Sequence, residues 1–143
     1  MKQNLMLIIM SLLSILFMTF HLTDDTLRAR AGTFEAGGLT LVVVPILVVW
    51  LYGTLVLAER RSGHVIMLIG ALLGMSMPVV HVMLGPGRVF SGQLVKSSGG
   101  FLFVWTLHVL GVTGMFSLIL SERGLWSLQR DQRKQNTPSK SLV

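Results

Sequence analysis

The sequence predicts an all-α membrane protein in which four transmembrane helices form an up-down bundle with both termini in the cytoplasm. Hydrophobic residues make up 52% of the 143 residues and charged residues only 13%, about half the charged share of a soluble domain. The apolar residues gather in four runs, each close to the ~20 residues that a helix needs to cross a bilayer. Lys and Arg are distributed unequally between the segments that join these runs.

The four predicted transmembrane helices contain no Asp, Glu, Lys or Arg. The first run is longer than the apolar core of a cleaved signal peptide, so we interpret it as a retained anchor. Thr23, followed by two aspartates, is typical of a helix stop and a new cap. The predicted helices cover about residues 4–22, 38–58, 65–84 and 101–120.

The segments between the runs set the predicted orientation and domain organisation. Short connections favour antiparallel neighbours in the bundle. Eight of the twelve Lys and Arg residues lie before the first run, in the turn 59–64, or after the fourth run. Because basic residues concentrate in cytoplasmic segments, we place both termini in the cytoplasm. Residues 1–122 are the predicted transmembrane domain, and residues 123–143 are a basic, largely disordered cytoplasmic tail.

Small residues recur at helical spacing in the third and fourth runs. Gly70 and Gly74 form a GxxxG pattern, and Gly111 and Gly114 are three residues apart. Small residues let helix backbones approach closely in lipid, where the hydrophobic effect does not join helices. We expect these glycines to pack within one chain rather than between two copies.

The net charge of +6 is interpreted as a topology signal and an attraction to anionic lipid at the tail, not as a nucleic-acid surface. The expected partners are the lipid bilayer and either a second copy or a membrane complex that contains this chain as a subunit. The absence of cysteine excludes disulfides, thiolate metal sites and cysteine nucleophiles. Short loops and the lack of cysteine favour a bacterial inner (plasma) membrane.

Three histidines and two carboxylates are predicted to lie in the outer third of the bundle: His21, Asp24, Asp25, His81 and His108. If the first helix continues by one turn, both aspartates share a face with His21. Ionisable groups inside a membrane are costly and usually face the bundle interior or a watery cavity. Neutral imidazoles and carboxylates suit a transition metal, so these five residues are the predicted metal ligands.

Other interpretations of the same histidines stay open. His81 and His108 are the predicted cofactor-binding pair, since two histidines on facing helices can ligate a haem. A histidine beside a carboxylate can also carry a proton. The simplest alternative is that His81 and His108 donate hydrogen bonds to backbone carbonyls or to Ser and Thr on other helices.

The sequence does not assign a catalytic residue, because it lacks a P-loop, a GxSxG motif and a GxGxxG motif after a strand. We therefore predict a small multi-pass membrane protein with a structural or accessory role. One alternative is a metal- or haem-binding membrane protein, including an oxidoreductase. A second alternative is a proton-linked carrier of small solutes.

Overall fold

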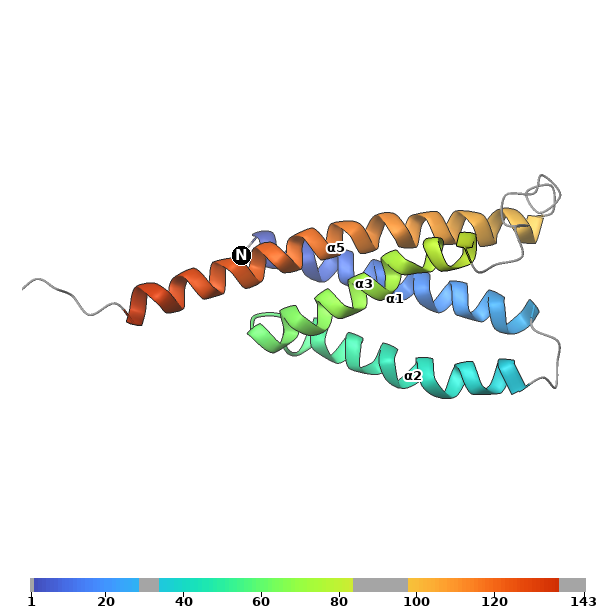
Figure 1. The fold of residues 1–143 in the computed structure, drawn as a ribbon, viewed down its shortest axis with the longest axis horizontal. Coiled ribbons are helices and arrows are strands. Elements are labelled where there is room, and N and C mark those ends of the chain that lie inside the picture. The colour runs from blue at the N-terminus through green and yellow to red at the C-terminus, as the bar shows by residue number, and fades with distance from the viewer. Residues whose placement is uncertain (1, 29–33, 84–97, 137–143) are drawn as a thin grey trace, which may run out of the picture.

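The computed structural model describes residues 2–28, 34–83 and 98–136, which form four helices and, within these ranges, no strand. This confirms the all-helical class. Successive helices run in opposite directions, so that the turn from α2 to α3 lies at the same end as the start of α1 and the end of α5 (Figure 1). The helices are α1 (Lys2–Arg28), α2 (Phe34–Leu55), α3 (Arg61–Met83) and α5 (Ser98–Asn136).

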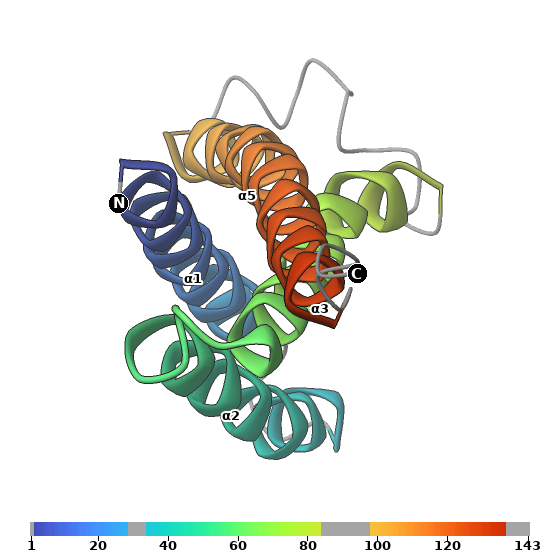
Figure 2. The same ribbon diagram turned by 90° about the vertical axis from the view of Figure 1, so that its left-hand side faces the viewer.

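The long helix α5 packs most extensively against α3 and then against α1. Helix α2 has fewer contacts, which it divides between α3 and α1. Viewed from the end, α2 lies at the edge of the bundle, on the side away from α5 (Figure 2). The bundle is therefore a tightly packed group of three helices with a more loosely attached fourth.

Two helices continue beyond their predicted ends. Helix α1 runs through Thr23 to Arg28, and the Thr23 hydroxyl donates to the carbonyl of Thr19 at 2.7 Å instead of capping a new helix. Helix α5 continues to Asn136 rather than ending near residue 120, so it passes through most of the segment that we predicted as a largely disordered tail. The rest of that segment, residues 137–143, lies outside the described residues.

Among the residues that the structure describes, three helices are long and apolar enough to cross a membrane. In the described part of α2, the apolar stretch is shorter and covers Val42–Leu55. The whole of α2 has 22 residues, or about 33 Å at 1.5 Å per residue. The three candidate spans are Gln3–Asp24, Arg61–His81 and Gly100–Lys134.

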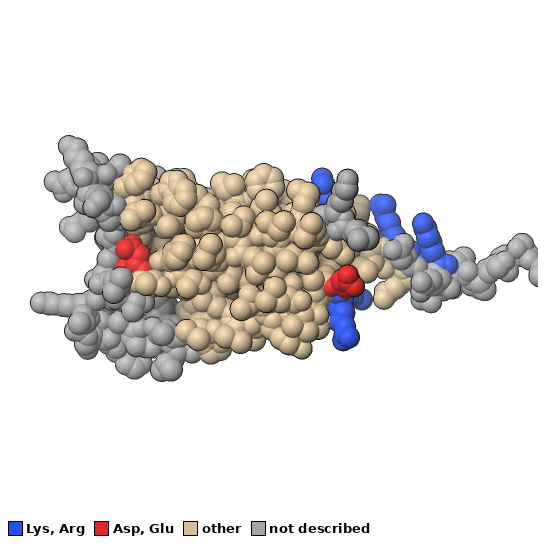
Figure 3. All heavy atoms as spheres, turned by 180° about the vertical axis from the view of Figure 1, so that it is seen from behind, with Lys and Arg blue, Asp and Glu red and all other residues tan. Residues whose placement is uncertain are grey.

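The bundle exposes large apolar side chains and, inside, combines an apolar core with small polar residues. Leu, Val, Ile, Phe and Met side chains are exposed along all four helices. Buried positions include several hydroxyl-bearing residues, which is typical of helices that pack against each other in lipid. On the face drawn in Figure 3, the described acidic and basic side chains lie at the two ends. The buried hydroxyl-bearing residues are Ser11, Ser14, Thr54, Thr113, Ser117 and Ser121.

Helices α3 and α5 come into backbone contact at Gly114. A Cβ atom at this position would lie 2.9 Å from the backbone nitrogen of Met75 and 3.1 Å from the carbonyl oxygen of Ala71. Gly74 lies against Leu110, and Gly111 lies against the ring of Pro78. The expected packing of these glycines within one chain is confirmed.

Replacing Gly114 by alanine tests this contact. Alanine favours an isolated helix by about 1 kcal/mol over glycine, yet we expect Gly114→Ala to lower the free energy of unfolding by about 1–3 kcal/mol, because backbone atoms of α3 occupy the space. The measurement is thermal or denaturant-induced unfolding in detergent. The control is Val112→Ala on the exposed face of the same helix, which should leave stability almost unchanged. A Gly114→Ala protein as stable as the parent would contradict the close approach.

Candidate functional site

Two histidines and a phenylalanine from three different helices contact one another. The rings of His21 on α1 and His81 on α3 are 4.7 Å apart between centroids and meet edge to face at 79°. The Phe103 ring of α5 lies 5.0 Å from His21 and 5.5 Å from His81. His21 is fully buried. We call these three residues the histidine cluster.

The hydrogen bonds fix the tautomer of His81. Its Nδ1 lies 2.9 Å from the carbonyl oxygen of Met77, and a carbonyl oxygen only accepts. Nδ1 therefore carries a proton, and Nε2 of the neutral ring carries the lone pair. His108 makes the same bond to the carbonyl of Val104 at 2.7 Å. For Nδ1 of both residues, donation to a backbone carbonyl is thus confirmed.

The structure does not bring His108 to the histidine cluster. His108 is exposed on α5, whereas Phe103 of the same helix is buried against the cluster. Five residues along a helix correspond to a rotation of about 140°, so the two side chains leave α5 in different directions. The histidine whose ring contacts His81 is His21, and the pairing of His81 with His108 stays a prediction.

The two predicted carboxylates follow His21 on the extended α1. Asp24 is partly buried and three residues beyond His21, a spacing that places both on one face of the helix. Asp25 also belongs to α1, but its side chain is outside the described part of the structure. Within the described ranges, no group of three His, Cys, Asp or Glu side chains is placed to hold a metal ion.

The fourth histidine has a packing role that the sequence analysis did not recognise. His64 is almost fully buried, and its Nδ1 donates to the carbonyl of Arg60 at 3.1 Å. Its ring lies directly against Gly124 of α5, where a Cβ atom would overlap the imidazole. Gly124, which follows the apolar run 101–120 inside the continuous helix α5, is the signal that could have indicated this contact.

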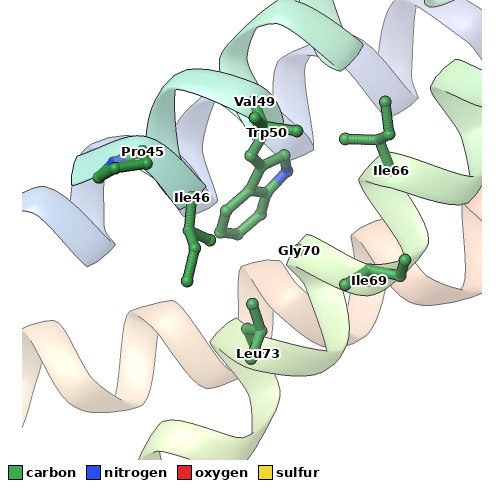
Figure 4. Close-up of a pocket in the computed structure, with 8 residues that line it drawn as sticks. All are labelled: Pro45, Ile46, Val49, Trp50, Ile66, Ile69, Gly70 and Leu73. Carbon is green, nitrogen blue, oxygen red and sulfur yellow. The ribbon is translucent and has the colours of Figure 1, made fainter. Parts of the chain in front are cut away.

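An apolar groove separates the middle of α2 from α3 (Figure 4). Its volume is about 380 Å³. Gly70 lies directly beneath the Trp50 indole, and these two residues bring the helices together beside the groove. The sequence offered Pro45 and Gly70 as local signals but no indication of a cavity. The lining residues are Pro45, Ile46, Val49, Trp50, Ile66, Ile69, Gly70 and Leu73.

A circuit of three hydrogen bonds holds Trp50 in the wall of this groove. The indole Nε1–H donates to the hydroxyl of Ser11 on α1 at 2.9 Å. The Thr54 hydroxyl donates to the Trp50 carbonyl at 2.9 Å, so the 2.7 Å contact of Ser11 with Thr54 uses the Ser11 proton. Each donor in the circuit therefore has an acceptor, and the circuit joins α2 to α1.

Comparisons with protein-family models, with curated proteins and with solved structures find no match to this chain. The arguments about its function therefore rest on the histidine cluster, the α2–α3 groove and the distribution of charge.

The Ser11 hydroxyl is predicted to be the critical member of the circuit. Ser11→Ala leaves the indole Nε1–H buried without its acceptor, which should cost about 1–3 kcal/mol of stability. We also expect altered Trp50 emission, measured in a protein whose other tryptophans carry Trp105→Phe and Trp126→Phe. Thr23→Ala removes an exposed hydroxyl from the same helix and serves as the control. Equal stability of the two variants would show that the circuit does not hold α2.

Proposed function

We propose that the chain is an integral membrane protein with four spans and a structural or accessory role. The observation that carries this proposal is the surface of the bundle, which exposes large apolar side chains along all four helices, while serine and threonine hydroxyls are buried beside the apolar core. Soluble monomers rarely expose extended apolar patches. Lipid tails, in contrast, cover such a surface and keep it from contact with water.

We further propose that both termini lie in the cytoplasm, and that the membrane is a bacterial inner membrane. The described Lys and Arg side chains visible in Figure 3 gather at the end that contains the α2–α3 turn and the projecting part of α5. Arg60 and Arg61 lie in or beside that turn, and Arg123 lies near the same end. Basic residues at one end of a bundle favour its cytoplasmic placement.

The length of α5 supports an interfacial role for its last third. Its 39 residues extend about 58 Å, nearly twice the ~30 Å thickness of a hydrocarbon core. The projecting part carries Trp126, which is 66% exposed, and the Arg130 guanidinium lies 5.0 Å from its ring centroid. Tryptophan suits the headgroup layer, and arginine suits anionic lipid.

The accessory role is supported by the use of polar groups inside the bundle. Ser11, Trp50 and Thr54 bond to one another, and Nδ1 of His81 bonds to its own helix. These polar groups stabilise the packing of the helices or satisfy their backbone carbonyls. The outer surfaces of the bundle are then the parts available for interaction with lipid or other subunits.

The membrane topology can be mapped with single cysteines, because the natural chain contains none. We expect Ser62→Cys and Lys134→Cys to react with a membrane-impermeant maleimide only after the cells are lysed. Ser91→Cys, between α3 and α5, should react in spheroplasts before lysis. The cysteine-free parent controls for background labelling. Reaction of Ser62→Cys and Lys134→Cys from opposite sides would contradict the four-span arrangement.

The histidine cluster favours metal binding as a second candidate function. A histidine that ligates a metal usually donates its other ring N–H to a carbonyl or carboxylate, as Nδ1 of His81 does toward Met77. An imidazole centroid lies about 3 Å from a metal bound at ~2.0 Å. The centroids of two such rings would be about 5 Å apart if both rings bound a tetrahedral ion, and about 6 Å apart if they bound opposite faces of a haem. The observed centroid separation of 4.7 Å is close to the spacing on a tetrahedral ion and shorter than the spacing across a haem. Burial of His21 among rings gives no support to the aqueous vestibule that a proton-linked carrier requires.

Metal analysis distinguishes the two candidate functions. The accessory role predicts well under one metal ion per purified chain and no Soret absorbance. The metal-binding candidate predicts about one ion per chain and, after loading with Co²⁺, the visible absorption of a tetrahedral site. His81→Phe should abolish that absorption, whereas His108→Phe should retain it, because His108 lies away from the cluster. Stoichiometric metal in the parent and its loss in His81→Phe would overturn the purely accessory role.

A further inference from the structure

The α2–α3 groove is an open hollow in the apolar surface with a fixed floor. The Trp50 indole lies at that floor, only 1% exposed, and is held by its bond to Ser11 at 2.9 Å. Because Nε1–H is used in this bond, the indole leaves no unpaired donor beside the groove. Figure 4 shows Ile46 and Leu73 at one side of the indole and Ile66 at the other. The groove therefore offers a rigid, wholly apolar surface to an occupant.

The groove follows from the way α2 meets α3. Gly53 lies against Ile66, and Gly70 lies against Trp50, so the two helices are in close contact near the turn that joins them. Toward the start of α2 the helices diverge (Figure 1). Side chains of ordinary size fill a contact between parallel helices but not the widening gap between diverging ones. The cavity of about 380 Å³ is the space that they leave.

Positive charge lies beside the end of α3 nearest to the groove. Arg60 and Arg61 are both exposed, in company with the exposed Glu59. From Arg61, Ile66 is about 8 Å and Leu73 about 18 Å farther along the helix. A phospholipid whose phosphate binds these two arginines would therefore place its acyl chain at the depth of the groove. Guanidinium groups bind phosphate oxygens through paired hydrogen bonds.

We propose that the α2–α3 groove is a specific binding site for one anionic phospholipid, with an acyl chain against Ile46, Ile69 and Leu73, above the buried Trp50, and the phosphate at Arg60 and Arg61. This inference rests on the proposed membrane location and orientation, which place the turn at the cytoplasmic surface. It goes beyond that proposal by assigning a headgroup charge, a binding cavity and the residues that bind each part. The net positive charge of the turn selects an anionic headgroup over a zwitterionic one.

Trp50 provides the probe for this site. The test protein carries Trp105→Phe and Trp126→Phe, so that only Trp50 fluoresces, and it is reconstituted in phosphatidylcholine vesicles. Phosphatidylglycerol or phosphatidylcholine with brominated acyl chains is then added at matched mole fractions, because bromine quenches tryptophan at short range and Trp50 lies directly beneath the groove. We expect brominated phosphatidylglycerol to reach half-maximal quenching at a mole fraction about fivefold lower or more.

Matched variants separate the two parts of the site. Arg60→Gln with Arg61→Gln should remove the preference for phosphatidylglycerol, whereas Arg130→Gln with Arg133→Gln on α5 should retain it. Ile69→Phe should fill the groove and reduce quenching by both lipids. Val48→Phe, exposed on α2 but not part of the groove lining, should not. Helical content and unfolding temperature confirm that each variant is folded.

The outcomes are distinct. Equal quenching by the two lipids, or a preference that survives Arg60→Gln with Arg61→Gln, would overturn the specific site and leave ordinary bilayer lipid around the protein. An absence of quenching by either lipid would overturn the binding of an acyl chain in the groove, whereas failure of the protein to incorporate into the vesicles would contradict the membrane location on which the inference rests. Loss of quenching in Ile69→Phe together with loss of selectivity in the arginine variant would support both the groove and the headgroup contact.

Discussion

The contact of α3 with α5 at Gly114 is the constraint on which the rest of the bundle depends. Helices gain little from the hydrophobic effect when lipid surrounds them, so their association depends on close packing and hydrogen bonds. Gly114 lets the backbone of α5 reach Ala71 and Met75. With α3 fixed on α5 in this way, and α1 packed against α5, the side chains of His21, His81 and Phe103 meet.

Helix α2 is attached by a different interaction. Its contacts with α1 include the polar circuit of Ser11, Trp50 and Thr54, and Gly70 of α3 receives the flat face of the Trp50 indole. Interhelical hydrogen bonds in membranes contribute about 0.6–2 kcal/mol each, less than extended close packing does. The attachment is therefore local, and α2 diverges from α3 on one side of it. Trp50 thus fixes α2 on the bundle beside the groove.

The sequence predicted those features that depend on composition along the chain. Four helices, the concentration of Lys and Arg at one end, and the packing of Gly74, Gly111 and Gly114 all follow from runs and spacings. Helix ends were less predictable, because a charged residue marks a membrane boundary and not the end of a helix. Glu122 and Arg123 belong to such a boundary, yet α5 continues through them, and the next proline is Pro138.

The candidate sites were only partly predictable for a related reason. Position along a helix gives depth, but contact between helices also depends on rotation about each axis. His21 and His81 were correctly placed near one level, whereas His108 faces outward because it is rotated by about 140° from Phe103. The groove had no sequence signal of its own, since it arises from the angle between α2 and α3 and not from any single residue.

The close packing of α3 on α5 and the local attachment of α2 predict different responses to a bound lipid. A ligand that binds one arrangement of the helices stabilises that arrangement in proportion to its concentration and affinity. An acyl chain in the groove contacts both α2 and α3, where their own side chains do not meet. Its binding would therefore stabilise α2 on the bundle far more than it would stabilise the α3–α5 contact. The attachment of α2 would then depend on the anionic lipid content of the membrane, while the histidine cluster, which contains no residue of α2, would not.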